Sequence, residues 1–82
     1  MNESEIQTVI TGTLREVFTR KHPGEAVPDI KATTVFTREL QLDSFDWAEV
    51  IIRLEIETGR DPFRNGIPSG LTTVGDIFVL YQ

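Results

Sequence analysis

The sequence contains no cysteine, and this absence removes several kinds of site at once. Without a thiol, the chain can form no disulfide framework, no thiolate metal site and no cysteine nucleophile. Any thiol chemistry must therefore come from a group that is added after synthesis. The length of 82 residues predicts a single domain, residues 1–82, with a modest core and a modest net stability.

Basic residues and long apolar runs are also scarce. Eight Lys and Arg residues oppose 13 Asp and Glu residues, and the formal charge of −5 disfavours a nucleic-acid partner and favours docking onto basic protein surfaces. No apolar run approaches the length of a membrane span, and the acidic segment Met1–Glu5 lacks the apolar core of a signal peptide. We therefore expect a cytoplasmic protein with no membrane span.

The only histidine, His22, lies far in sequence from Ser44, the serine discussed below. A hydrolase triad needs a base within hydrogen-bond reach of its serine and an oxyanion hole, and no G-x-S-x-G elbow surrounds Ser44. The aspartates and glutamates show neither zinc nor EF-hand spacing. We expect His22 to be a solvated loop residue, and we expect no catalytic residue and no dedicated metal site.

Apolar periodicity predicts an all-α fold with three main helices. In residues 3–20, apolar side chains recur at three- and four-residue steps. Residues 44–58 form the second predicted helix, with Gly59 as its C-terminal cap. The last helix is predicted to begin after Thr73, with Asp76 at capping-box spacing.

Two further segments connect these helices. Residues 21–43 form a long loop for so small a domain, and connections of this length are usually functional or locally ordered. Apolar residues predict that its second half contacts the core: Val35, Phe36, Leu40 and Leu42. Residues 61–66 carry turn signals, and we expect a short fourth helix between them. No segment alternates with a period of two residues, so the predicted fold contains no sheet.

The second helix carries two apolar stripes when its residues are placed about 100° apart. The stripe that suits the core consists of Trp47, Val50, Ile51 and Leu54. The other stripe consists of Phe45, Ala48, Ile52 and Ile56, with Glu49 and Glu55 on its edges. Either the helix is central and both stripes are buried, or the second stripe is a docking surface for a protein with a basic rim.

Ser44 stands at the predicted start of this helix, within the segment L-D-S-F-D. Asp43 and Ser44 are both favoured N-cap residues, and Asp46 complements the helix dipole, so a cap alone can explain the pair. The same position also suits a modified serine, because free N–H groups at a helix N-terminus favour a phosphodiester. The residues alone leave both interpretations open.

Residues 39–46, E-L-Q-L-D-S-F-D, resemble the attachment motif of acyl carrier proteins, D-L-G-x-D-S-L-D. Phe36 stands where the family commonly has an aromatic residue, and Glu49 lies in a matching acidic second helix. The segment Leu71–Val74 resembles the I-T-T-V sequence that leads into the family's last helix. The resemblance covers essentially the whole chain and implies a small acyl-carrier-like helical bundle.

The resemblance implies that Ser44 carries 4′-phosphopantetheine, which a phosphopantetheinyl transferase takes from coenzyme A. The thiol of this arm holds acyl groups as thioesters, and the carrier, which is not itself an enzyme, presents them to acyl-loading and acyl-processing enzymes at a raised effective concentration. The implied partner-recognition surface consists of Asp43, Phe45, Asp46, Glu49, Ile52 and Glu55. The expected function is that of a stand-alone, monomeric acyl carrier protein.

Several residues depart from the family pattern. Gln41 replaces a glycine, Phe45 replaces a leucine and Arg53 interrupts the acidic helix, which favours a specialised lipid or polyketide-type pathway over housekeeping fatty acid synthesis. Family members can shelter an acyl chain between their helices, and Trp47 on the core stripe is placed to fill that space. The alternatives are a peptidyl or aminoacyl carrier, and a non-modified helical interaction module in which Ser44 is only a helix cap.

Overall fold

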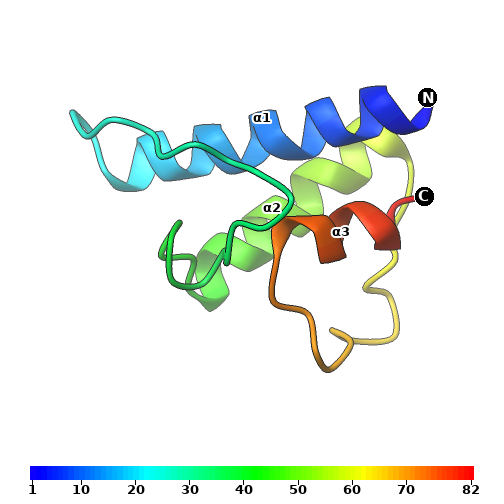
Figure 1. Cartoon of the computed structure of the whole chain (residues 1–82). Coiled ribbons are helices and arrows are strands. Elements are labelled where there is room, and N and C mark those ends of the chain that lie inside the picture. Colours follow the sequence, from blue (N-terminus) through cyan, green and yellow to red (C-terminus); the bar gives the residue numbers. More distant parts are fainter.

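The computed structural model describes residues 1–82 and contains three helices (Figure 1). Helix α1 spans Glu3–Lys21, α2 spans Ser44–Thr58 and α3 spans Val74–Leu80. The only β-type pairing is an isolated bridge between Val35 and Thr73. None of the helices has the length and apolarity that a membrane crossing requires. The all-α class, the three main helices and the long α1–α2 connection are confirmed.

Each helix begins with a capping box. The side chain of the N-cap residue accepts a hydrogen bond from the backbone N–H of the residue three positions later, and the side chain of that later residue accepts one from the backbone N–H of the N-cap residue. The three pairs are Asn2–Glu5, Asp43–Asp46 and Thr73–Asp76. Gly59 ends α2 in the left-handed conformation, with φ 71°. The predicted caps at Gly59 and Thr73 are therefore confirmed.

Residues 62–65 form turns, so the expectation of a short fourth helix is wrong. The N–H of Arg64 donates to the carbonyl of Asp61 at 3.3 Å, and the N–H of Gly66 donates to the carbonyl of Phe63 at 2.9 Å. Both bonds span three residues, so the α-helical pattern of four is never made. Pro62 has no N–H to donate, and Gly66 leaves helical conformation with φ 107°.

One hydrophobic core joins the three helices to the α1–α2 connection. Its most deeply buried members are Ile10, Leu14 and Val17 of α1, Val50 and Leu54 of α2, Val74 and Ile77 of α3, Tyr81 just after α3, and Leu40 of the connection. Phe36 and Leu42 of the connection are buried beside them. Because burying a large apolar side chain contributes about 1.5–3 kcal/mol, these residues anchor the connection, as the sequence predicted.

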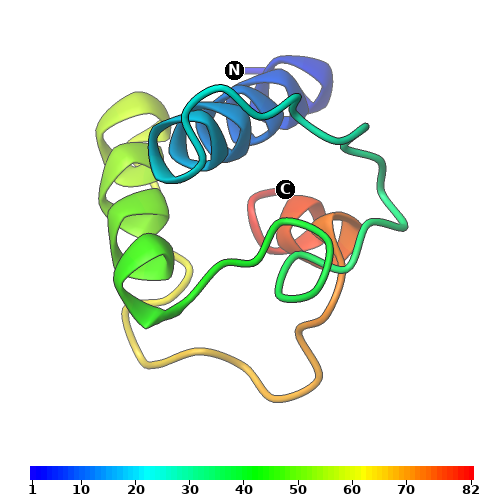
Figure 2. The same cartoon turned by 90° about the vertical axis from the view of Figure 1, so that its left-hand side faces the viewer.

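Backbone hydrogen bonds also attach the α1–α2 connection to the start of α3, and the two segments lie close together in Figure 2. The N–H of Val74 donates to the carbonyl of Thr34 at 2.9 Å, and the N–H of Gly75 donates to that of Ala32 at 2.8 Å. A Cβ atom at Gly75 would lie 2.9 Å from the Ala32 oxygen, so this approach requires glycine. The connection is thereby fixed before it enters α2.

Candidate functional site

Ser44 is the first residue of α2, and its side chain is exposed. The residue that caps the helix is Asp43, whose Oδ1 accepts the N–H of Asp46 at 2.9 Å. In return, Oδ2 of Asp46 accepts the N–H of Asp43 at 3.1 Å. No hydrogen bond joins the Ser44 hydroxyl to another group of the chain. The interpretation of Ser44 as the helix cap is therefore wrong, and its hydroxyl is free to face solvent.

Lys21, the last residue of α1, holds this cap in place. Its ammonium donates to Oδ2 of Asp46 at 2.6 Å, to the Gln41 carbonyl at 2.7 Å and to Oδ2 of Asp43 at 3.3 Å. Asp46 is buried, and a buried carboxylate needs such a partner because burial removes its hydration. The hydrogen bond from Lys21 to Asp46 raises the pKa of Lys21. The residues that precede Ser44 are thus tied to α1.

Asp43 is held in its ionised form by the same arrangement. The hydrogen bond from the backbone N–H of Asp46 is the main cause that lowers the pKa of Asp43, and the Lys21 ammonium lowers it further. The Asp43 carboxylate next to Ser44 therefore stays negatively charged, and it accepts hydrogen bonds from the Asp46 N–H and from Lys21.

Gln41 occupies the place of the glycine in the acyl carrier motif, and its backbone explains why glycine suits that place. Its φ of 55° lies in the left-handed region, and it is the only residue other than glycine with a positive φ. This conformation costs a residue with a side chain about 1–2 kcal/mol. In this conformation the Gln41 carbonyl accepts a hydrogen bond from Lys21.

A cleft of about 240 Å³ opens beside Ser44. Asp43 and Ser44 lie among its lining residues, and its apolar lining consists of Phe36, Leu42, Trp47, Ile67 and Leu71. The Trp47 ring stacks on Phe36, with 5.0 Å between ring centroids and 3° between planes. Phe63 does not line the cleft and packs edge-on against Trp47 at 5.4 Å. Trp47 therefore lines the cleft and also packs against Phe63 of the core.

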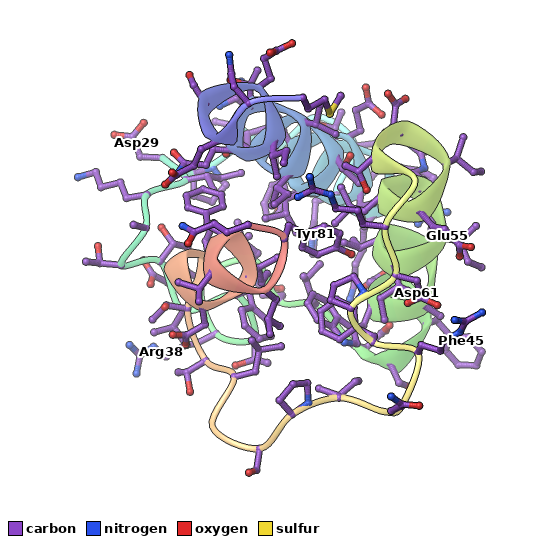
Figure 3. The ribbon with its side chains drawn as sticks, turned by 90° about the vertical axis from the view of Figure 1, so that its right-hand side faces the viewer. Asp29, Arg38, Phe45, Glu55, Asp61 and Tyr81 are labelled. Atoms are coloured by element: carbon purple, nitrogen blue, oxygen red, sulfur yellow. The ribbon has the colours of Figure 1, made fainter.

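The second stripe of α2 is exposed, so the interpretation in which both stripes are buried is wrong. We call Phe45, Ala48, Ile52 and Ile56 the outer strip. Phe45 is 86% exposed, Ile56 78% and Ile52 58%, whereas Trp47, Val50 and Leu54 of the other stripe are buried. Figure 3 shows Phe45 and Glu55 on the side of α2 that faces away from the bundle.

The acids predicted for the partner surface have different environments. Asp46 lies beneath the surface in the α2 cap, with a side chain that is only 8% exposed. Glu49 forms ion pairs with Arg20 at 2.5 Å and with Nε of Arg53 at 3.1 Å. Glu55 is exposed and has no ion pair. Of the acids expected to contact partners, only Glu55 is both exposed and unpaired, and Asp46 has a structural position instead.

Sequence reasoning missed Lys21 as a residue of the site. The sequence signal was a basic residue near the end of the first helix, where it also suits the helix dipole. Nothing in the sequence pairs it with Asp46, which lies 25 positions later. Only the crossing of α1 and α2 brings the two together.

His22 also differs from its prediction as a solvated residue. Its ring packs against Phe18 with 4.7 Å between centroids, and its Nδ1 lies 3.3 Å from a Glu25 carboxylate oxygen. The side chain is only 18% exposed because it caps the C-terminal end of α1 beside that ring. It makes no hydrogen bond to Ser44.

No group of three or more His, Asp or Glu side chains is arranged to hold a metal ion. Comparisons with protein-family models, with curated proteins and with solved structures find no match for this chain. The interpretation of the site therefore depends on its geometry and on the motif at residues 39–46.

Proposed function

We propose that this chain is an acyl carrier protein whose Ser44 bears a 4′-phosphopantetheine arm, and that it serves a specialised lipid or polyketide-type pathway. The observation that carries the proposal is the division of roles between two neighbouring residues. Asp43 caps α2, while the exposed Ser44 hydroxyl makes no hydrogen bond within the chain. A serine that is needed only for capping would itself accept the N–H bond.

The surroundings of Ser44 suit a phosphodiester. The first N–H groups of a helix have no partner within the helix, and the helix dipole favours an anion at that end. Asp43 takes up the N–H of Asp46, and its carbonyl accepts that of Trp47. The N–H of Ser44, at the helix end, makes no backbone hydrogen bond within the chain and is left for an anion on the Ser44 oxygen. The apolar cleft beside Ser44 offers a surface for the non-polar parts of an arm or a short cargo.

The modification is a phosphoryl transfer in which Ser44 is the acceptor. A bond forms between Oγ of Ser44 and the phosphorus of coenzyme A that bears the pantetheine. The bond from that phosphorus to the bridging pyrophosphate oxygen breaks, and 3′,5′-adenosine bisphosphate leaves. The hydroxyl proton passes to a base that the transferase supplies, since Ser44 bonds to no base of its own chain. The arm then supplies the thiol that the chain lacks.

Intact mass measurement tests the proposal directly. The protein is incubated with coenzyme A, Mg²⁺ and a promiscuous phosphopantetheinyl transferase. We expect a gain of one phosphopantetheine, complete loss of this gain in Ser44→Ala, and no effect of Ser69→Ala, which changes another exposed serine. No gain on the folded protein, or the same gain in Ser44→Ala, would overturn the proposal.

The cargo is identified by a second mass measurement on protein purified from its native host. Treatment with hydroxylamine cleaves thioesters, so the mass difference before and after treatment gives the attached group. A fatty or polyketide acyl group supports the proposal as stated. An amino acid would assign the chain to the peptidyl or aminoacyl carriers, which share the modified serine.

A further inference from the structure

Lys21 binds the chain on both sides of Ser44 but makes no hydrogen bond to Ser44 itself. Its ammonium donates to the Gln41 carbonyl at 2.7 Å, before Ser44, and to the Asp46 carboxylate at 2.6 Å, after it. A third hydrogen bond, 3.3 Å long, joins the ammonium to Asp43. A lysine ammonium has three N–H donors, so these three contacts use all of them.

The backbone of residues 40–43 has few other polar attachments. The N–H groups of Leu40 and Gln41 make no backbone hydrogen bond, and that of Leu42 makes only a long one, of 3.4 Å. The side chains of Leu40 and Leu42 are buried, but apolar burial is non-directional. The directional contacts between this stretch and the rest of the molecule therefore come mainly from Lys21.

Lys21 has a fixed origin on α1. It is the last residue of that helix, and the N–H of the next residue, His22, still donates to the Phe18 carbonyl at 2.8 Å. The His22 ring also packs against the Phe18 ring, with 4.7 Å between centroids. The ammonium thus ties residues 41–46 to a regular helix whose end is held by its own contacts.

The neighbouring cation of α1 does not duplicate this tie. Arg20 lies 2.5 Å from Glu49 but 3.9 Å from Asp46, and its side chain is 57% exposed. Without Lys21, the Asp46 carboxylate, only 8% exposed, would have no close cation, and the Gln41 carbonyl would lose its partner. The left-handed backbone at Gln41 would then have no polar contact to hold it.

We infer that Lys21 is a positioning residue for the modification of Ser44, and that it acts through Gln41, Asp43 and Asp46. The inference rests on the proposed function, because only a reaction at Ser44 gives the place of its hydroxyl a chemical role. Phosphoryl transfer needs Oγ of Ser44 in line with the breaking P–O bond, and a misplacement of about 1 Å can cost about a hundredfold in rate. Lys21 takes up no proton and makes no bond to phosphorus.

Single-turnover modification by an excess of a promiscuous phosphopantetheinyl transferase, with coenzyme A and Mg²⁺, tests this role in wild type and Lys21→Met. Circular dichroism first establishes a temperature at which both proteins are folded. We expect the maximal rate constant to fall about tenfold or more, because the acceptor hydroxyl is less well placed. The transferase concentration that gives half of the maximal rate should change less than about threefold, because the exposed side chains of α2 stay the same. If Lys21→Met does not fold, Lys21→Gln, which keeps one donor group, should lower the maximal rate constant at least about threefold.

Two control variants separate positioning from charge and from stability. Arg20→Gln removes one positive charge at the next position of α1, where the nearest partner is Glu49. Leu54→Ala empties a fully buried position about 15 Å along α2 from Ser44. Both should keep the maximal rate constant within about twofold of wild type, because neither removes a hydrogen bond to residues 41–43.

NMR order parameters give a readout that does not depend on the transferase. We expect the backbone N–H groups of Gln41, Leu42 and Asp43 to have values near about 0.85 in wild type and below about 0.6 in Lys21→Met. Leu54→Ala should leave these values unchanged. This measurement shows whether the tie orders the stretch before Ser44.

The outcomes are distinct. An unchanged maximal rate constant in the folded Lys21 variant, an equal fall in Leu54→Ala, or unchanged order parameters in Lys21→Met would each overturn the inference. So would a loss that appears only in the half-saturating concentration, since this would make Lys21 a docking contact. If the wild type gains no phosphopantetheine, the proposed function itself fails; if it is modified and only the variants behave otherwise, the role of Lys21 alone is lost.

Discussion

Helices α2 and α3 begin with the same capping box but present different residues. At the start of α3, Asp76 accepts hydrogen bonds from the N–H groups of Thr72 and Thr73 at 3.0 and 2.9 Å and has no ion pair. The first helical residue there, Val74, is fully buried. At the start of α2, Asp46 is tied to Lys21, and the first helical residue, Ser44, is exposed. Local sequence sets where a helix starts, while contacts with other elements determine whether its first residues are buried, paired or exposed.

The largest expected difference in stability is between substitutions of Asp46 and Asp76, the two carboxylates of the capping boxes. Asp46→Ala should lower the free energy of unfolding by about 2–3 kcal/mol, because it removes a buried, charge-assisted partner of Lys21 as well as a cap. Asp76→Ala should cost clearly less, since its carboxylate accepts from the backbone N–H groups of Thr72 and Thr73 and has no ion pair. Urea denaturation of both variants measures this difference. Equal losses would show that Lys21 adds nothing to the α2 start.

Substitution of the first helical residue should cost more stability at the start of α3 than at the start of α2. Val74→Ala should lower the free energy of unfolding by about 2 kcal/mol, because it empties a fully buried position. Ser44→Ala should change it by less than about 0.5 kcal/mol, as for other exposed sites without a special contact. Thermal and urea unfolding provide the measurement. A loss near 1 kcal/mol in Ser44→Ala would restore a capping role to its hydroxyl.

The smallest expected difference lies just before the two caps. The chain adopts a left-handed conformation at Gln41 before α2 and at Gly70 before α3. Gln41→Gly should stabilise the protein by about 0.5–1 kcal/mol, because relief of strain outweighs the added freedom of the unfolded chain. Gly70→Gln should destabilise it by a similar amount. If Gln41→Gly destabilises the protein, the side chain of Gln41 must contribute a contact that outweighs its backbone strain.

Local patterns were sufficient to predict most of the fold. Periodicity and capping residues gave the start of every helix and the Gly59 end of α2, since these features depend on neighbours in sequence. They also gave the outer strip, because side-chain direction around a helix follows from spacing alone. The expected fourth helix is absent, because the segment between Pro62 and Gly66 forms turns whose hydrogen bonds span three residues and not four.

The site could be predicted only in part, because its electrostatics depend on pairs that are distant in sequence. Ser44 was found from its motif, but the choice between Asp43 and Ser44 as cap required the observed hydrogen bonds, since both residue types cap helices well. The pairing of Lys21 with Asp46 and of Arg20 with Glu49 required the packing of α1 against α2. A count of acids alone therefore does not show which of them are paired.

Trp47 gives the protein an intrinsic fluorescent reporter beside Ser44. It is the only tryptophan of the chain, it lines the cleft beside Ser44, and its indole stacks on Phe36 of the α1–α2 connection. Indole fluorescence responds to the polarity and motion of its surroundings. Emission from the unlabelled protein should therefore follow both the filling of the cleft and any displacement of the connection, and a stopped-flow experiment could time each of them without a dye.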